Sequence, residues 1–330
     1  MSTNDKKPGE FRTSIGGQAL IEGIMMLGPD KRAIVCRTED GFVEKVTPVK
    51  SVKNRFFLWR LPFFRGIAGF FSAMVNGVKA ISFSADQLPE DMQEQPGKLD
   101  LWIERHFSDE TAQKIIIGIA VVLGIALSLV LFLLLPTVIV GFIPGLKESF
   151  YWRTLVEGVV KIVIFFVYLL LCSRLKDMKR LFAYHGAEHK TIFCYEHGEE
   201  LTVENVRKYK RFHPRCGTSF IFLTLAISIL VYTLLPINSE LFIEAFGVSK
   251  LIGDMLRVCC KIIFLPIVVG ISYELIRIAG KYDNVLTKII SAPGLAIQRL
   301  TTKEPADEMI EVAIASMKPV LPENAEDAKW

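Results

Sequence analysis

The chain has 330 residues, of which 51% are hydrophobic and only 22% are charged, and its formal net charge is +4. Its mean hydropathy is positive, and it contains uncharged stretches longer than the roughly 20 residues that a helix needs to cross a bilayer. This composition excludes an ordinary soluble globular protein, a disordered chain and a fibrous protein. The small, scattered net charge gives no reason to expect nucleic acid as a partner, so the lipid bilayer is the expected one.

Residues 1–60 are predicted to form a cytoplasmic segment that contains a small β-hairpin. The chain begins with MSTNDKKPGEFRTS, which lacks the apolar stretch of a cleaved signal peptide. Residues 33–50 then show two short β-type runs on either side of Glu39-Asp40-Gly41, a pattern typical of a hairpin. The glycine- and methionine-rich stretch before them has one acid, Glu22, for which we expect an ordinary hydrogen-bonding role.

Residues 61–85 predict a helix that lies on the membrane or dips into it. Arg65 and Lys79 leave only 13 uncharged residues between them, which is shorter than a crossing helix requires. A polar linker and helix, residues 86–114, follow. If residues 61–83 crossed the bilayer instead, the N-terminus would lie on the opposite side of the membrane.

Four transmembrane helices are predicted, arranged as two hairpins that cover residues 115–172 and 218–278. Charged residues in or beside these spans, Glu157 with Lys161 and Glu274 with Arg277, are interpreted as helix-end ion pairs near the interface. An ion path is the alternative interpretation. The apolar runs are Ile115–Leu146, Thr154–Cys172, Gly217–Ser239 and Val258–Ile278.

The orientation in the membrane follows from the distribution of lysine and arginine. Residues 174–216 hold ten of them, whereas the connections 143–153 and 239–257 hold two each. Because positively charged loops stay in the cytoplasm, the central loop, the N-terminus and the C-terminal tail, residues 279–330, are predicted on the cytoplasmic side of the plasma membrane. The basic residues of the loop also suit contacts with anionic lipid headgroups.

The central loop, residues 173–217, holds four of the five histidines. His185 and His189 are four residues apart, so on a helix they share one face and can offer two imidazoles to one metal ion. With Glu188 they form His-x-x-Glu-His, the inverted zincin motif, in which the histidines bind zinc and the glutamate activates water. Downstream, His213 and Cys216 form a second pair whose imidazole and thiolate also suit zinc.

Two designs of a zinc site follow, and the spacing does not choose between them. In a catalytic site, the first histidine pair and one of His213 or Cys216 hold Zn²⁺, a water takes the fourth position and Glu188 is the general base. In a structural site, both pairs close a tetrahedron, and the zinc contributes only folding free energy. The alternative to both designs is that these histidines cap helices or lie among lipid headgroups.

Four segments form a specific combination of motifs: Ile15–Met26, His185–Thr191, His213–Ser219 and the tail Thr301–Ala315. In this combination the chain resembles the YqhQ-like family of bacterial membrane proteins (DUF1385), over nearly its whole length. The resemblance implies a site at the same histidines, because members of the family are commonly labelled as metal-dependent enzymes. It leaves the reaction open.

We therefore expect an all-α polytopic membrane protein with four transmembrane helices as two hairpins, a small N-terminal β-hairpin segment and a cytoplasmic metal-site loop. The first expected function is a zinc-dependent hydrolase at the cytoplasmic face of the membrane, acting on a lipid headgroup or a membrane-associated peptide. Glu188 would be its catalytic base; the metal ligands would be His185, His189, His213 and Cys216. The alternatives are a non-enzymatic membrane scaffold or assembly factor with structural zinc, and a small transporter.

Overall fold

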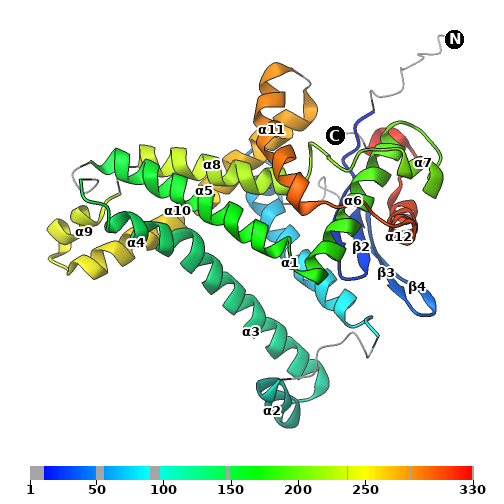
Figure 1. Ribbon diagram of the computed structural model, residues 1–330, viewed down its shortest axis with the longest axis horizontal. Coiled ribbons are helices and arrows are strands. Elements are labelled where there is room, and N and C mark those ends of the chain that lie inside the picture. The colour runs from blue at the N-terminus through cyan, green and yellow to red at the C-terminus, as the bar shows by residue number, and fades with distance from the viewer. Residues whose placement is uncertain are drawn as a thin grey trace. The chain divides into compact units, whose positions relative to one another are not determined.

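The computed structural model describes residues 11–49, 56–89, 97–145, 149–235, 237–282 and 284–328. These residues are mostly helical, with one small antiparallel sheet near the N-terminus (Figure 1). They divide into two compact units, each made of segments far apart in the sequence. The first unit takes Met1–Pro89, Leu169–Thr224 and Val269–Trp330, and the second takes Glu90–Tyr168 and Leu225–Val268.

Four consecutive strands form the sheet of the first unit. They are β1 (Gly16–Leu20), β2 (Gly23–Leu27), β3 (Lys31–Thr38) and β4 (Gly41–Pro48), paired antiparallel in the order β1-β2-β3-β4. The expected hairpin is confirmed as β3–β4, and it turns at Gly41, whose φ of 127° few other residues adopt. The strands β1 and β2 add a second hairpin that the sequence did not predict.

Helices of the first unit cover both faces of this sheet. On one face, α6 (Lys176–Glu196) and α12 (Asp307–Met317) pack against the strands. On the other face, α1 (Phe64–Ala85) packs through Ala80. The core on the α6 side includes Ile24, Met26, Ala33, Val35, Tyr184, Ala187, Ile310 and Ala313; the core on the α1 side is Leu20, Met25, Ile34, Cys36 and Ala80.

Shorter helices complete the first unit. The helix α11 (Val285–Thr301) leads to the segment before α12, and the short α7 (Val203–Arg207) packs on α6 and α12. The 3-10 turns are η2 (Phe57–Arg60), η6 (Lys318–Val320) and η7 (Ala325–Ala328).

The second unit is built from long apolar helices. A helix from Asp109 to Gly141 contains α3 (Asp109–Leu129), the π-helical η4 (Val130–Leu134) and α4 (Leu135–Gly141), which has Pro136 in its first turn. Parts of three further helices belong to this unit and the remainder to the first: α5 (Phe150–Cys172), α8 (Gly217–Leu234) and α10 (Lys250–Lys281). The shorter helices are α2 (Lys98–His106) and α9 (Ser239–Phe246).

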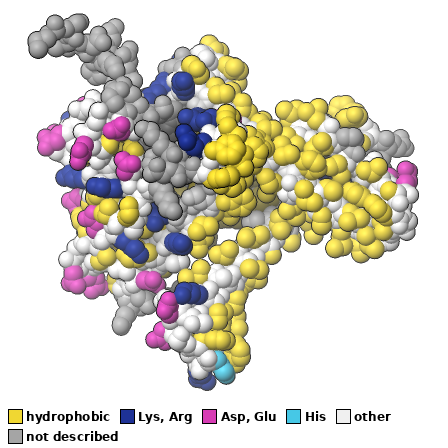
Figure 2. Space-filling view, turned by 180° about the vertical axis from the view of Figure 1, so that it is seen from behind, with side chains coloured by type: hydrophobic (Ala, Val, Ile, Leu, Met, Phe, Trp, Pro, Cys, Tyr) yellow, Lys and Arg dark blue, Asp and Glu magenta, His cyan; other side chains and the backbone are white. Residues whose placement is uncertain are grey.

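Among the described residues, five helices are long and apolar enough to cross a membrane. Four of them, Asp109–Gly141, α5, α8 and α10, each cover most or all of one predicted span, and the fifth is α1. Figure 2 shows hydrophobic side chains over much of the visible surface of the second unit, whereas charged side chains gather over the part of the first unit that holds the sheet. These helices indicate a membrane protein, and the count of four spans stays a prediction.

The charged residues inside the apolar helices have other partners than expected. Glu157 of α5 does not pair with Lys161 of the same helix; its carboxylate accepts from Arg257 and Lys261 of α10 at 2.8–2.9 Å. Glu274 of α10 accepts from Arg65 of α1. The expectation of an ion pair between Glu157 and Lys161 was therefore wrong, because packing of the helices brings partners from other helices closer.

Candidate metal centre

The middle of α6 is enclosed by the rest of the first unit, and residues 186–192 are all buried. Two glycines, Gly186 and Gly17, let other parts of the chain come close to this part of α6. A Cβ at Gly186 would lie 2.1 Å from the carbonyl oxygen of Lys303, in the segment after α11. A Cβ at Gly17 of β1 would lie 2.9 Å from Cδ of Glu188. The polar side chains of α6 therefore point into a buried site, between the sheet and the C-terminal part of the chain.

Three of the predicted ligands come together in this site. His185 and His189 follow each other by one turn of α6, with ring centroids 4.3 Å apart. Cys216, just before α8, places its Sγ 3.1 Å from Nε2 of His185. One ligand atom from each of the three residues lies within 4.8 Å of the others. Two nitrogens and one sulfur at this spacing fit the donor set that Zn²⁺ prefers in proteins.

Backbone carbonyl groups orient both imidazole rings. Nδ1 of His185 lies 2.8 Å from the carbonyl oxygen of Thr301, and Nδ1 of His189 lies 2.6 Å from that of Arg211. A carbonyl oxygen only accepts, so each Nδ1 carries the proton and donates it. In the neutral ring, Nε2 is then left with its lone pair for a metal. Metal-binding histidines in proteins are held in this way.

The charges of the site favour a thiolate at Cys216. Burial alone would raise the pKa of this thiol, but the neighbouring His185 and His189 outweigh it and hold the pKa well below its usual range. Burial alone would likewise lower the pKa of His185, but the Cys216 thiolate beside it raises that pKa to about 9. The thiolate also accepts from the backbone N–H and the hydroxyl of Thr218, at 3.5 and 3.4 Å. A thiolate is the form of cysteine that binds metal.

Glu188 lies next to these ligands and is almost fully buried. Burial raises the pKa of its carboxyl group, against the lowering effect of His185 and His189. Among the described residues, neither Oε2 of Glu188 nor Nε2 of His189 has a hydrogen-bond partner. Buried polar atoms seldom lack a partner, and an unseen ion or water is a common reason when they do.

His213, the fourth predicted ligand, lies outside this group of three. Its Nε2 is 3.6 Å from the carboxylate of Glu196, and its backbone N–H donates to the side chain of Gln298 at 2.7 Å. Burial lowers the pKa of His213 to about 4, so the ring is neutral at pH 7. Burial alone would raise the pKa of Glu196, but the hydrogen bond with His213 and the charge of Arg215 hold it below its usual range. His213 thus belongs to a neighbouring polar cluster, in contact with the ring of His189.

A cavity of about 320 Å³ adjoins that neighbouring cluster. Its wall contains Glu196 and Phe193 of α6 and Arg215, the residue before Cys216. Two further basic side chains, Arg12 and Lys288, line it as well. The cavity is large enough for a small organic group, and basic residues outnumber acidic ones along its wall.

Sequence reasoning missed the residues that support the ligands. They include Gly17, whose lack of a side chain admits Glu188, and the carbonyl groups of Thr301 and Arg211. The available signal was the combination of motifs, because Ile15–Met26 and Thr301–Ala315 both pack against α6. Backbone carbonyl groups leave no signature in the residue types, so their partners could not be predicted.

Replacing Gly186 with alanine is expected to destabilise the first unit by about 1–3 kcal/mol, because the new methyl group would overlap a backbone oxygen that cannot rotate away. Urea unfolding of the purified protein measures the change. Gly118→Ala in α3 is the matched control: its Cβ would meet nothing within 4 Å, so stability should stay equal or rise. Equal stability of the two variants would contradict the close packing at Gly186.

The chain is similar to known proteins over most of its length. Residues 61–323 match the family described as "Protein of unknown function (DUF1385)". The "Uncharacterized protein YqhQ" of Bacillus subtilis (strain 168) is 33% identical over 310 residues, which cover 93% of this chain and 92% of that protein. No solved structure matches the chain significantly. The two matches together show that the chain belongs to the DUF1385 family.

Proposed function

We propose that the protein is a zinc-dependent hydrolase of the bacterial plasma membrane, with its site on the cytoplasmic side. The observation that carries the proposal is the donor set of His185, His189 and Cys216 beside the buried carboxylate of Glu188. Catalytic zinc sites have three protein ligands and one open position, whereas structural sites are closed by four. The engagement of His213 with Glu196 favours the catalytic design.

The roles of the residues follow from their chemistry. Zn²⁺ in a site of this kind lowers the pKa of a bound water to about 7 and polarises a carbonyl or phosphoryl oxygen. Glu188 would accept a proton from the attacking water at Oε2, the atom without a partner among the described residues. Burial raises the pKa of this carboxyl group above its usual range. His185 and His189 would hold their rings in place through the Nδ1 contacts.

The contacts within the first unit support four spans with both termini inside. The sheet packs against α6, so an even number of crossings must separate these two parts of the chain. The helix Asp109–Gly141 and α5 supply two crossings, and a third by α1 would place the sheet and α6 on opposite sides. Ser84 near the end of α1 also donates to the carbonyl of Ile21 in the sheet, which fits a helix lying along the membrane surface.

A substrate with an anionic group, such as a phospholipid headgroup, suits the surroundings of the site. The cavity beside the neighbouring polar cluster is lined by Arg12, Arg215 and Lys288, opposed by one acid, Glu196. Basic residues on the cytoplasmic side also attract anionic lipids. A membrane-associated peptide with acidic residues is the second substrate class that this lining fits.

Cobalt substitution tests whether the metal has an open coordination position. The experiment does not require a known substrate. We expect the full-length protein in detergent to bind one Co²⁺ with the absorption bands of a tetrahedral thiolate complex, and azide to change those bands by entering the open position. Glu188→Gln should bind Co²⁺ equally well, because a proton acceptor is removed and no ligand is lost. It should lower the release of headgroups from phospholipid vesicles by about 100-fold or more.

The matched control is Glu200→Gln, at an exposed position just after α6, which should behave as the wild type. Bands that azide does not change would indicate four protein ligands and the structural design. A Glu188→Gln variant that releases headgroups at the wild-type rate would contradict the role of Glu188 as the base.

A further inference from the structure

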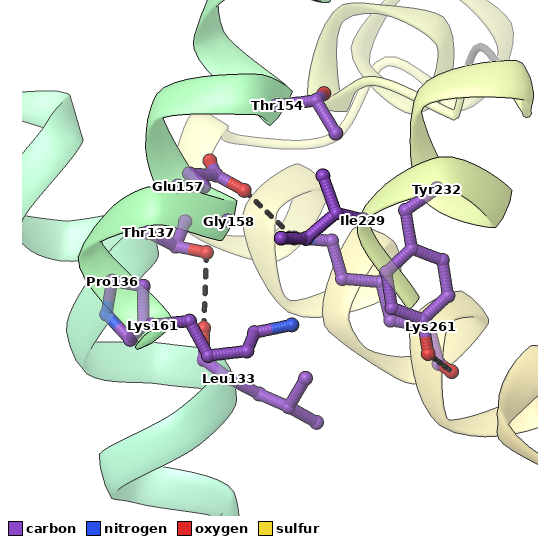
Figure 3. A pocket seen from close by; sticks show the side chains of 10 residues that line it. All are labelled: Leu133, Pro136, Thr137, Thr154, Glu157, Gly158, Lys161, Ile229, Tyr232 and Lys261. Carbon is purple, nitrogen blue, oxygen red and sulfur yellow. Dashed lines mark hydrogen bonds and ion pairs between the residues drawn. The ribbon is translucent and has the colours of Figure 1, made fainter. Parts of the chain in front are cut away.

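The second unit encloses a group of charged side chains between its apolar helices. Figure 3 shows Glu157 and Lys161 of α5, Lys261 of α10 and Tyr232 of α8 around one space. The cavity there has a volume of about 10 Å³, which is room for a single water-sized body. The residues that line it belong to the second unit, whereas the metal ligands all belong to the first.

Positive charge exceeds negative charge around this cavity. The carboxylate of Glu157 accepts two hydrogen bonds from Arg257, at 2.8 and 2.9 Å, and one from Lys261, at 2.8 Å. Lys161 is left over: among the described residues its one hydrogen-bond partner is the hydroxyl of Ser228, at 3.4 Å. Three cations therefore face one anion.

The nearest additional charges do not remove this excess. Arg153 lies 3.4 Å from Glu157 and 3.8 Å from Asp254, so this arginine and this aspartate add one charge of each sign. With these two included, the cations are Lys161, Lys261, Arg153 and Arg257, and the anions are Glu157 and Asp254. The group remains two positive charges in excess.

Burial makes the excess costly. Glu157, Lys161 and Arg257 are 4%, 7% and 1% exposed, within helices apolar enough to span a membrane. Charged groups in such surroundings are stable only when they are paired. The hydroxyl of Thr154, which lines the cavity, also has no hydrogen-bond partner among the described residues.

The two lysines also share one neighbour. The ammonium groups of Lys161 and Lys261 lie 5.5 and 5.9 Å from the centroid of the Tyr232 ring. Both ammonium groups thus lie beside the same ring, whose weak attraction cannot replace a counter-charge. An anion between the two ammonium groups would offset their repulsion.

We propose that this cavity binds a small inorganic anion of the halide class, held by Lys161 and Lys261. The size of the cavity excludes a phosphate or a lipid headgroup, and a single water would leave the charge excess unchanged. The excess over Glu157 selects an anion over a cation. The site does not depend on the proposed hydrolase, because its residues belong to the other unit.

Halide-dependent stability of the full-length protein in detergent tests this site. At constant ionic strength, chloride or bromide in place of gluconate should raise the Tm of the wild type in a saturable manner. Lys161→Met should weaken the apparent halide affinity at least about tenfold, because it removes a charged donor and keeps the apolar stem. The line width of ³⁵Cl in NMR should show the same loss of binding.

The matched control is Lys114→Met, at an exposed lysine of α3 whose ion pair with Glu110 is on the surface. It should keep the halide response of the wild type. A wild type that halides stabilise no more than gluconate does would overturn the proposal, whether or not the variants fold. An equal response of the wild type and Lys161→Met would overturn it as well.

Discussion

Replacing Glu157 with glutamine is expected to destabilise the protein by about 3–5 kcal/mol, the usual cost of removing one partner of a buried ion pair. The carboxylate is the acceptor for Arg257 and Lys261, and both cations are buried away from bulk solvent, which therefore cannot take its place. The amide of glutamine keeps the shape of the side chain but loses the charge. The yield of folded protein in detergent and the denaturant midpoint measure the effect.

Two further variants test whether the loss of stability comes from the buried charge of Glu157. Glu240→Gln, on the exposed side of α9, should leave the midpoint within about 0.5 kcal/mol of the wild type. A triple variant with Glu157→Leu, Arg257→Met and Lys261→Met should recover much of the loss, because apolar residues often replace buried ion pairs without cost. If Glu157→Gln is as stable as Glu240→Gln, this carboxylate does not hold the cations together.

The same cluster marks a limit of prediction from the sequence. The apolar runs that predict the spans are long, so their positions follow from composition, and a helix of the structure covers most or all of each one. The partners of the charges inside them do not follow, because i,i+4 spacing suggests Lys161 for Glu157 although the actual partners are about 100 residues away in α10. Spacing describes one helix, and ion pairs between helices depend on how the helices pack.

The sheet shows a second limit, which comes from burial. β3 and β4 are β-type runs on either side of a turn at Gly41 and are therefore predicted as a hairpin, although β3 also has four consecutive buried residues and no alternation. The sequence GIMML of β2 has four consecutive buried residues, because α6 and α12 cover one face of the sheet and α1 the other. Alternation, the main signal of a strand, is absent when both faces are buried.

The candidate site was predictable to the extent that one helix determines it. Four-residue spacing predicts that His185 and His189 share a face, and their ring centroids are 4.3 Å apart in α6. The choice between His213 and Cys216 as the next ligand could not be made, because three-residue spacing suits both. In the structure Cys216 lies against His185, whereas His213 contacts the side chains of Gln298 and Glu196.

Replacing Cys216 with alanine is expected to weaken zinc binding more than 100-fold, beyond the 10- to 100-fold cost of losing a residue that only supports a ligand. Cys216 is the one thiolate in the group of three, and its pKa is held low by both histidines. Without it, His185 and His189 would offer two nitrogens, too few for a stable site. Competition with a zinc-binding dye, on full-length protein in detergent, measures the affinity.

The comparison with other variants makes this result specific to the site. Cys259→Ser, at an exposed cysteine of α10, should bind zinc as the wild type does. His185→Ala should lose zinc as Cys216→Ala does, and Glu188→Gln should retain it. Because His213 lies against Glu196, His213→Ala should cost at most about 10- to 100-fold, the range of a supporting residue. If zinc affinity survives both Cys216→Ala and His185→Ala, the metal binds elsewhere. If His213→Ala loses as much zinc affinity as Cys216→Ala does, the site has the closed design with four protein ligands.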